Sequence, residues 1–187
     1  MVAVIIILVI VVLLIAWIAG TYNKLVAQKQ RVGNAWSQID VQLQRRFDLI
    51  PNLVEIVKGY MAHEAGTLEK VTELRTAWTK ASSVEEKAKL DNELSNTMKT
   101  IMAVSESYPD LKANQNFLDL SGQLNETENK ISFSRQFYND TVTRYNTSIE
   151  MFPSNIIAGM FHFSQASLFE VQEDEARQNV KISFDNK

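Results

Sequence analysis

The sequence predicts an all-α protein, an antiparallel bundle of long helices preceded by a single N-terminal transmembrane helix. Three observations support this. Residues 1–20 carry no charged side chain and consist almost wholly of Val, Ile, Leu and Ala. Beyond Gly20, apolar residues recur every three or four positions, which is the period of an amphipathic helix. Only six Gly and three Pro interrupt the 187 residues.

The apolar run of residues 1–20 has the length of a membrane span. At about 1.5 Å per residue it forms a helix of roughly 30 Å, the thickness of the bilayer's hydrocarbon core. A cleaved signal peptide is the alternative, but no basic residue precedes the run, and a cut after Ala19 would place bulky Trp17 at position −3. We therefore expect a retained anchor whose residues 1–20 contact membrane lipid.

Basic residues flank only the C-terminal side of this span. Lys24, Lys29 and Arg31 follow it, and no acidic residue occurs before Asp40. Positive charge favours the cytoplasmic side of a membrane. The expected topology is single-pass, with the N-terminus outside and the C-terminal domain in the cytoplasm.

The first long helix is expected to continue directly from the anchor. Its apolar stripe comprises Tyr22, Leu25, Val32, Trp36, Ile39, Leu43, Phe47, Ile50, Val54, Val57 and Met61. Pro51 removes a backbone donor and clashes with the preceding turn. A kink or break is therefore expected near residues 48–52, with the stripe continuing past it.

Two shorter helices are expected next. The second carries Leu68, Val71, Leu74 or Arg75, and Trp78. Ser82 and Ser83 precede Glu85 and Glu86 at the spacing of a capping box, which predicts the start of a third helix ending before Pro109. Alternatively, the two serines mark only a kink in one continuous helix. The stripe of the third helix comprises Ala88, Leu90, Leu94, Met98, Ile101 and Val104.

A fourth long helix is predicted from about Asp110 to Met151, and a tail of residues 153–187 follows it. The stripe of this helix comprises Phe117, Leu120, Leu124, Thr127, Ile131, Ser134, Tyr138, Val142, Tyr145 and Ile149. In the tail, residues 170–177 are expected to be helical and residues 180–184 to be extended. Helices this long need packed partners, so residues 21–187 are expected to form one antiparallel bundle with this tail.

Several long motifs resemble the LemA family. They are Tyr22-Asn23-Lys24-Leu25-Val26, Asn34-Ala35-Trp36-Ser37-Gln38-Ile39-Asp40, Arg45-Arg46-Phe47-Asp48-Leu49-Ile50-Pro51-Asn52, Tyr108-Pro109-Asp110-Leu111-Lys112-Ala113, and the run from Tyr138-Asn139 through Tyr145-Asn146 to Phe152-Pro153-Ser154-Asn155. The resemblance extends over essentially the whole chain. It implies a bacterial, single-span, all-helical protein and carries over no reaction. His162 departs from the small residue that resembling sequences place there.

Composition argues against several kinds of chemistry. The net charge is −3 and no basic face is evident, so nucleic acid is not an expected partner. The absence of cysteine excludes disulfides, thiol catalysis and cysteine–zinc sites. His63-Glu64 begins a metallopeptidase-like motif, but Thr67 stands where its second histidine belongs. We therefore expect no cofactor, no metal and no enzymatic activity.

Two groups of residues are candidate sites. The first is a polar group on the first long helix, comprising Gln38, Asp40, Arg45, Arg46, Asp48 and Asn52. It forms either an internal polar network or a docking face for a partner. The second is an apolar group in the tail, comprising Ile156, Ile157, Met160, Phe161 and Phe163. It folds back onto the bundle, dips into the membrane interface or contacts another subunit, because exposed apolar patches mark interfaces.

Taken together, these features predict a scaffold or adaptor at the bacterial inner membrane. Its anchor would confine a stiff bundle whose faces recruit an unidentified membrane or cytoplasmic protein, with a homo-oligomer as a further possibility. Two alternatives stay open at this point. One is a membrane-associated hydrolytic enzyme, and the other is a protein whose arrays shape the membrane.

Overall fold

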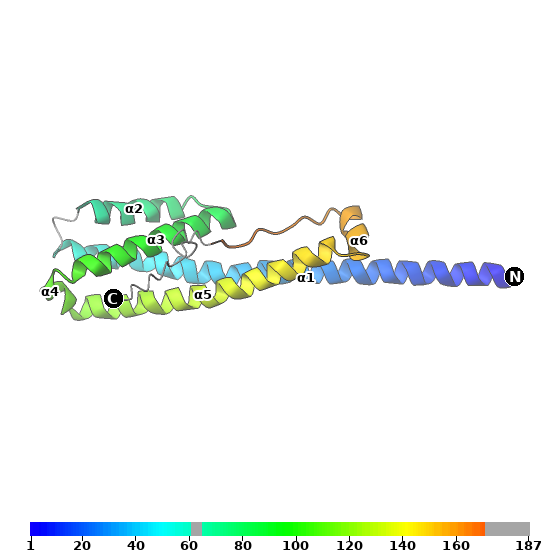
Figure 1. Cartoon of the computed structure of the whole chain (residues 1–187), viewed down its shortest axis with the longest axis horizontal. Helices are drawn as coiled ribbons and strands as arrows, with labels where there is room; N and C mark the ends of the chain where they lie inside the picture. The colour runs from blue at the N-terminus through cyan, green and yellow to red at the C-terminus, as the bar shows by residue number, and fades with distance from the viewer. Residues whose placement is uncertain (61–64, 171–187) are drawn as a thin grey trace, which may run out of the picture.

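The computed structural model describes residues 1–60 and 65–170, and every regular element within them is an α-helix. In chain order the helices are α1 (Val2–Lys58), α2 (Ala65–Trp78), α3 (Val84–Ser105), α4 (Pro109–Lys112), α5 (Gln115–Glu150) and α6 (Ser154–Met160). Figure 1 shows a rod in which α1 runs the full length, while α2, α3 and α5 gather around its C-terminal half. The all-α bundle with an apolar N-terminal helix is confirmed.

Helix α1 joins the apolar run to the bundle without interruption over 57 residues. Its N-terminal part projects alone beyond the other helices (Figure 1), and the side chains from Val2 to Ile15 are exposed. This part of α1 is long and apolar enough to cross a membrane. The predicted continuity of anchor and bundle is therefore correct.

The helix does not break at Pro51, contrary to one of the two outcomes expected there. Pro51 lies inside α1, which continues to Lys58. Ile50 and Leu53, on either side of the proline, are almost completely buried. Packing on both sides of the proline stabilises the helix against the loss of one backbone hydrogen bond.

Helices α2 and α3 are separate, and a capping box marks the boundary. The Ser83 hydroxyl accepts a hydrogen bond from the backbone N–H of Glu86 at 3.1 Å, and the Glu86 carboxylate accepts one from the Ser83 N–H at 3.2 Å. These bonds satisfy N–H groups that otherwise lack partners at a helix start. Ser83 is thus the N-cap of α3, and the alternative of one kinked helix is wrong.

The helix predicted from Asp110 to Met151 is divided near its start. Residues Pro109–Lys112 form the short α4, and α5 begins at Gln115. The side chain of Asn114 accepts a hydrogen bond from the backbone N–H of Phe117 at 3.1 Å. An asparagine favours this capping role over a place inside a helix, which explains the division.

The core follows the predicted stripes closely. Helices α1 and α5 pack together most extensively and run antiparallel, and the Phe47 ring stacks on Trp78 of α2 with centroids 4.3 Å apart. Trp36 is only partly buried and packs against the edge of this core. The buried apolar side chains of α1 are Leu25, Val32, Ala35, Ile39, Leu43, Phe47, Ile50, Leu53 and Val57.

Two tyrosines of α5 hold an extended segment of the tail, residues 164–169, which we call the strap (orange in Figure 1). The hydroxyl of Tyr145 donates to the carbonyl of Ser164 at 2.9 Å, and that of Tyr138 donates to the carbonyl of Ser167 at 2.8 Å. Burial raises the pKa of both phenols, which favours the protonated hydroxyls that donate these two bonds.

Two asparagines next to these tyrosines bind the strap backbone through both atoms of their amides. Asn146 accepts from the N–H of Ala166 and donates to its carbonyl, both at 2.9 Å. Asn139 contacts Phe169 in the same way, at 2.8 and 3.1 Å. The bonds satisfy backbone groups of a segment that has no sheet or helix partner.

The distance along α5 between the two Tyr-Asn pairs equals the distance along the strap between the backbone groups that they bind. Seven residues of helix rise about 10.5 Å, and three residues of extended chain cover about 10 Å. Moving from Tyr145 back to Tyr138 therefore advances the bonded carbonyl from Ser164 to Ser167.

Some predictions fall wholly or almost wholly outside the described residues. They are those made for Met61, His63-Glu64, residues 170–177 and residues 180–184.

Candidate functional site

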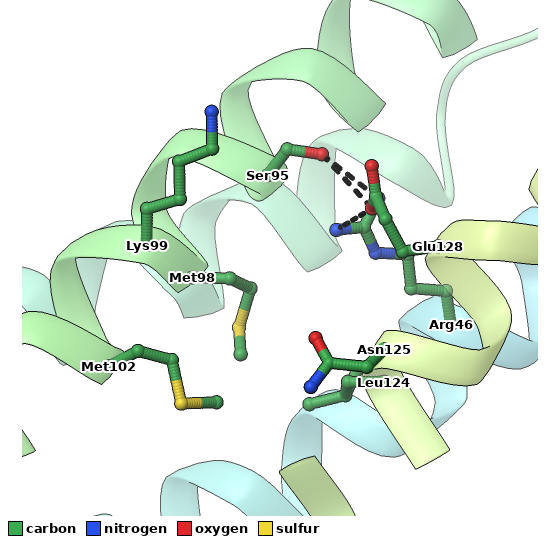
Figure 2. A pocket seen from close by; sticks show the side chains of 8 residues that line it. All are labelled: Arg46, Ser95, Met98, Lys99, Met102, Leu124, Asn125 and Glu128. Atoms are coloured by element: carbon green, nitrogen blue, oxygen red, sulfur yellow. Dashed lines mark hydrogen bonds and ion pairs between the residues drawn. The ribbon is translucent and has the colours of Figure 1, made fainter. Parts of the chain in front are cut away.

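Arg46 is the centre of a polar cluster that joins three helices. Its side chain projects from α1, and only 3% of the residue is exposed. One terminal nitrogen contacts Asp91 Oδ1 at 2.6 Å and Ser95 Oγ at 3.0 Å, both on α3. The other contacts Glu128 Oε2 on α5 at 2.5 Å (Figure 2). A single guanidinium thus connects α1, α3 and α5.

The charges of this cluster are buried unequally. Asp91 is as deeply buried as Arg46, whereas 45% of the Glu128 side chain is exposed. Burial raises the pKa of Asp91, and the adjacent Arg46 guanidinium opposes this shift. Removing two charges from water costs several kcal/mol per ion, and the short contact between Arg46 and Asp91 offsets part of this cost.

A hollow of about 340 Å³ lies beside the cluster. Its lining residues are Arg46, Ser95, Met98, Lys99, Met102, Leu124, Asn125 and Glu128, and Figure 2 shows the Met98, Met102 and Leu124 side chains along it. Flexible methionines adapt to irregular apolar surfaces. Within this lining the Ser95 hydroxyl donates a hydrogen bond to Glu128 Oε2 at 3.4 Å, and the mixture of apolar and charged side chains accommodates an amphipathic group.

Asp40, a partly exposed member of the predicted polar group, also contacts α3. It forms an ion pair with Lys87, whose ammonium lies 4.9 Å from the ring centroid of Trp78 and 5.7 Å from that of Trp36. A cation at these distances from aromatic faces gains electrostatic attraction. Lys87 therefore ties Asp40 to two tryptophans of different helices.

The other four predicted polar residues point away from the bundle. Gln38, Arg45, Asp48 and Asn52 are exposed, and their steps of seven, three and four residues keep them on one side of α1. Asp48 accepts a hydrogen bond from Gln44 at 2.8 Å, one turn earlier on the same helix. The structure thus divides the predicted group in two. Buried Arg46 and partly exposed Asp40 pair with residues of α3, and these four lie on an outer face.

A shallow groove between α1 and α5 lies at the edge of this outer face. Gln38 lines it together with Phe137 of α5. Phe137 is 56% exposed, and Phe133, one turn earlier on α5, is 76% exposed. We call Gln38, Arg45, Asp48, Asn52, Phe133 and Phe137 the outer surface. Two exposed aromatic side chains on one turn are more than a solvated helix face requires.

The predicted apolar group of the tail is divided as well. Ile157 is 1% exposed and Phe163 is half-buried, so these two side chains fold back onto the bundle. Ile156, Met160 and Phe161 remain exposed. The Phe161 and Phe163 rings lie 4.7 and 5.8 Å from the Tyr22 ring, which places α6 beside the beginning of the bundle part of α1.

Sequence reasoning missed the partners of Arg46. Asp91 occupies a position between Ala88 and Leu94 on the buried stripe of α3, where a charge signals a buried partner. Glu128 directly follows Thr127 of the α5 stripe, so its helical position gave no comparable signal. Phe133 and Phe137 could have been found as aromatic residues lying off their helix's apolar stripe.

The fold and these surfaces define a class of protein in which one apolar N-terminal helix continues into an antiparallel helical bundle. The model of the LemA family matches residues 35–184, and the chain belongs to this family. It is similar to Protein LemA of Metamycoplasma hominis, with 28% identity over 161 residues that cover 83% of this chain and 72% of the relative.

Two magnetosome proteins are also similar. Magnetosome protein MamQ 2 of Paramagnetospirillum magneticum shares 26% identity over 186 residues, covering 86% of this chain and 68% of the relative. Magnetosome protein MamQ of Magnetospirillum gryphiswaldense shares 22% identity over 174 residues, covering 79% and 64%.

Proposed function

We propose that the protein is a membrane-anchored scaffold or adaptor that presents a protein-binding face at a fixed orientation to the bacterial inner membrane. The observation that carries the proposal is the unbroken course of α1 from the apolar run to Lys58. A flexible linker would let the bundle reorient freely, whereas one helix transmits the orientation of the span to every bundle face.

The outer surface is the face proposed to bind the partner. It combines two exposed phenylalanines with polar side chains, including Arg45, and interface centres are enriched in aromatic residues and Arg. Arg46 inside the bundle and Asp40 at its edge, in contrast, pair with residues of α3 and hold the face in place. The partner is a protein of the same membrane or of the cytoplasm, a second copy of this chain included.

Confinement to the membrane supplies the mechanism. A partner held in the same bilayer meets the outer surface at an increased effective concentration, without any new contact. A standard protein interface buries about 800 Å² on each side, so a face of this kind needs neighbouring side chains of α1 and α5 as well.

Position-specific crosslinking in native membranes tests the proposal. A photoreactive phenylalanine analogue replaces Phe137 or Phe133, and the matched control replaces Thr76 on the exposed side of α2. We expect discrete crosslinked species from positions 133 and 137, with little from 76. Mass spectrometry identifies the partner, and two differently tagged copies reveal self-association. Equal or absent crosslinking at all three positions would refute the proposed face.

The membrane orientation has its own test. We propose a cytoplasmic bundle, on the basis of Lys24, Lys29 and Arg31 after the span. Because the chain contains no cysteine, a single cysteine at exposed Lys99 reports its side of the membrane. The thiol should resist an impermeant reagent in intact cells and react after permeabilisation. Labelling in intact cells would reverse the orientation.

A further inference from the structure

We propose that the connection between α5 and α6, together with α6 itself, lies in the lipid headgroup layer, so that the bundle touches the bilayer at a second place besides α1. The surface concerned comprises Met151, Phe152, Ile156, Met160 and Phe161, and we call it the turn surface. The ligand it takes is a phospholipid of the same bilayer that α1 crosses.

The turn surface lies at the height along α1 where the headgroup layer is expected. A span of residues 1–20 uses about 30 Å of hydrocarbon, and the headgroup layer occupies roughly 5–8 Å more, or about three to five helical residues. Tyr22 falls within that layer. The Phe161 ring lies 4.7 Å from the Tyr22 ring, so α6 sits at the same height.

The exposure of the turn surface is the second argument. Phe152 is 78% exposed, Met160 61%, Met151 59% and Ile156 51%. Ile157 and Ala158, on the opposite side of α6, are buried and fix this helix to the bundle. The apolar side chains therefore point outward from a firmly held element, and water is an unfavourable environment for them.

The positions of the first charged side chains mark where the chain passes from lipid to water at this level. Residues 151–169 contain no Lys, Arg, Asp or Glu, and neither do residues 1–23. Lys24 comes next on α1 and Glu150 comes next on α5, whereas Lys29, Arg31 and Arg144 lie farther along the two helices, and all five are exposed. The charge-free start of α1 thus meets residues 151–163 at one end of the bundle, where Lys24 attracts an anionic headgroup and Glu150 is the adjoining acidic residue.

A hollow at this end shows how a lipid would fit. It measures about 270 Å³ and lies between α1 and the end of α5. Trp17 and Lys24 line it from α1, and Met151 and Phe152 line it from the α5–α6 connection. Lys24 supplies a cation for a lipid phosphate, and the apolar side chains suit the upper part of an acyl chain. The turn surface is also continuous with the exposed anchor, which favours lipid over a second copy.

Spin-label accessibility in the full chain tests this inference. Single cysteines replace Phe152 or Ile156, and the control replaces Phe133, an equally exposed phenylalanine of α5 far from the anchor. Each labelled protein is reconstituted into vesicles of phosphatidylcholine and phosphatidylglycerol. We expect the ratio of oxygen to water-soluble nickel-chelate accessibility at positions 152 and 156 to exceed that at 133 several-fold.

Two outcomes would overturn the inference. One is a ratio at positions 152 and 156 equal to that at 133, which would place the turn surface in water. The other is protection that exists in vesicles but disappears in nanodiscs holding one copy each, which would assign the surface to a second copy. In either case crosslinking at the outer surface would remain a separate result.

A double variant of the turn surface tests whether its apolar side chains hold it in the headgroup layer. Phe152→Ser with Ile156→Ser removes exposed side chains only, so the melting temperature in detergent should stay unchanged. A label at position 160 should then lose its high oxygen ratio in this variant and keep it in Phe133→Ser. Retention of the ratio in the double variant would show that these side chains do not hold the surface in the headgroup layer.

Discussion

Arg46 of α1 and Asp91 of α3 form an ion pair of 2.6 Å in which each side chain is less than 5% exposed. The two residues lie 45 positions apart in the sequence. Their pairing joins α1 to α3, which the ion pair of Asp40 with Lys87 also connects, and a buried charge tolerates few alternative arrangements of the two helices.

Arg46→Met should lower the free energy of unfolding by about 3–5 kcal/mol, because it leaves the Asp91 carboxylate buried without a partner. Chemical denaturation in mild detergent, followed by far-UV circular dichroism, measures the change. The control is Arg46→Met with Asp91→Leu, which replaces the pair by apolar side chains and should recover most of the loss. A double variant no more stable than the single one would contradict this account.

The stability lost in Arg46→Met should depend on pH. Without Arg46 nothing comparable opposes the effect of burial, so the folded-state pKa of Asp91 rises further above its unfolded value. A carboxyl group with a raised folded pKa is most favourable below its unfolded pKa and loses that stability as pH increases through the folded pKa.

The difference between Arg46→Met and the parent protein should therefore shrink as the pH falls from 7 towards the ordinary aspartate pKa of about 4. Unfolding curves at several pH values measure this difference. Asp91→Asn removes the titrating group from both proteins, so the difference between Asp91→Asn alone and Asp91→Asn with Arg46→Met should lose this pH dependence. A difference that grows towards acid would refute the role given to Asp91.

Asn146→Ala should release the strap locally. The substitution leaves the N–H and carbonyl of Ala166 without partners, at a cost of about 1–3 kcal/mol. Hydrogen exchange of residues 164–169 should accelerate, while the α1–α5 core remains protected. The matched control is Asn155→Ala, since the Asn155 side chain is exposed. Equal exchange in both variants would mean that Asn146 does not hold the strap.

Two aromatic residues on α1 should differ in their contribution to stability. Phe47 is 1% exposed and stacks on Trp78, so Phe47→Ala should cost about 3–5 kcal/mol. Trp36 is only partly buried, and its larger side chain should cost less on truncation. Thermal or chemical unfolding of the two variants gives the order directly. A larger loss for Trp36→Ala would indicate that the ring contacts more than the described core.

The sequence predicted those features that depend on local rules. Helical periodicity located the core of α1 and α5, and the capping-box residues marked the start of α3. The division at Asn114 was missed because a single capping side chain outweighed the apolar pattern around it. A continuous α1 across Pro51 depends on burial of Ile50 and Leu53, which only tertiary packing provides.

The candidate residues were predicted less completely, for a related reason. Arg45 and Arg46 are neighbours in sequence, but one lies on the outer surface and the other inside the bundle. A shift of about 100° between successive helical residues separates them. The apolar stripe fixes which side is buried, whereas the partners Asp91 and Glu128 come from helices whose register the sequence does not reveal.

Because α1 is uninterrupted, a tilt of its membrane span moves the far end of the bundle sideways. From Tyr22 to Lys58 the helix rises about 54 Å at 1.5 Å per residue. Membrane helices tilt by about 20° on average, and such a tilt would move the far end of this one sideways by roughly 18 Å. Small changes in bilayer thickness at the root of α1 are therefore amplified into large displacements at its tip.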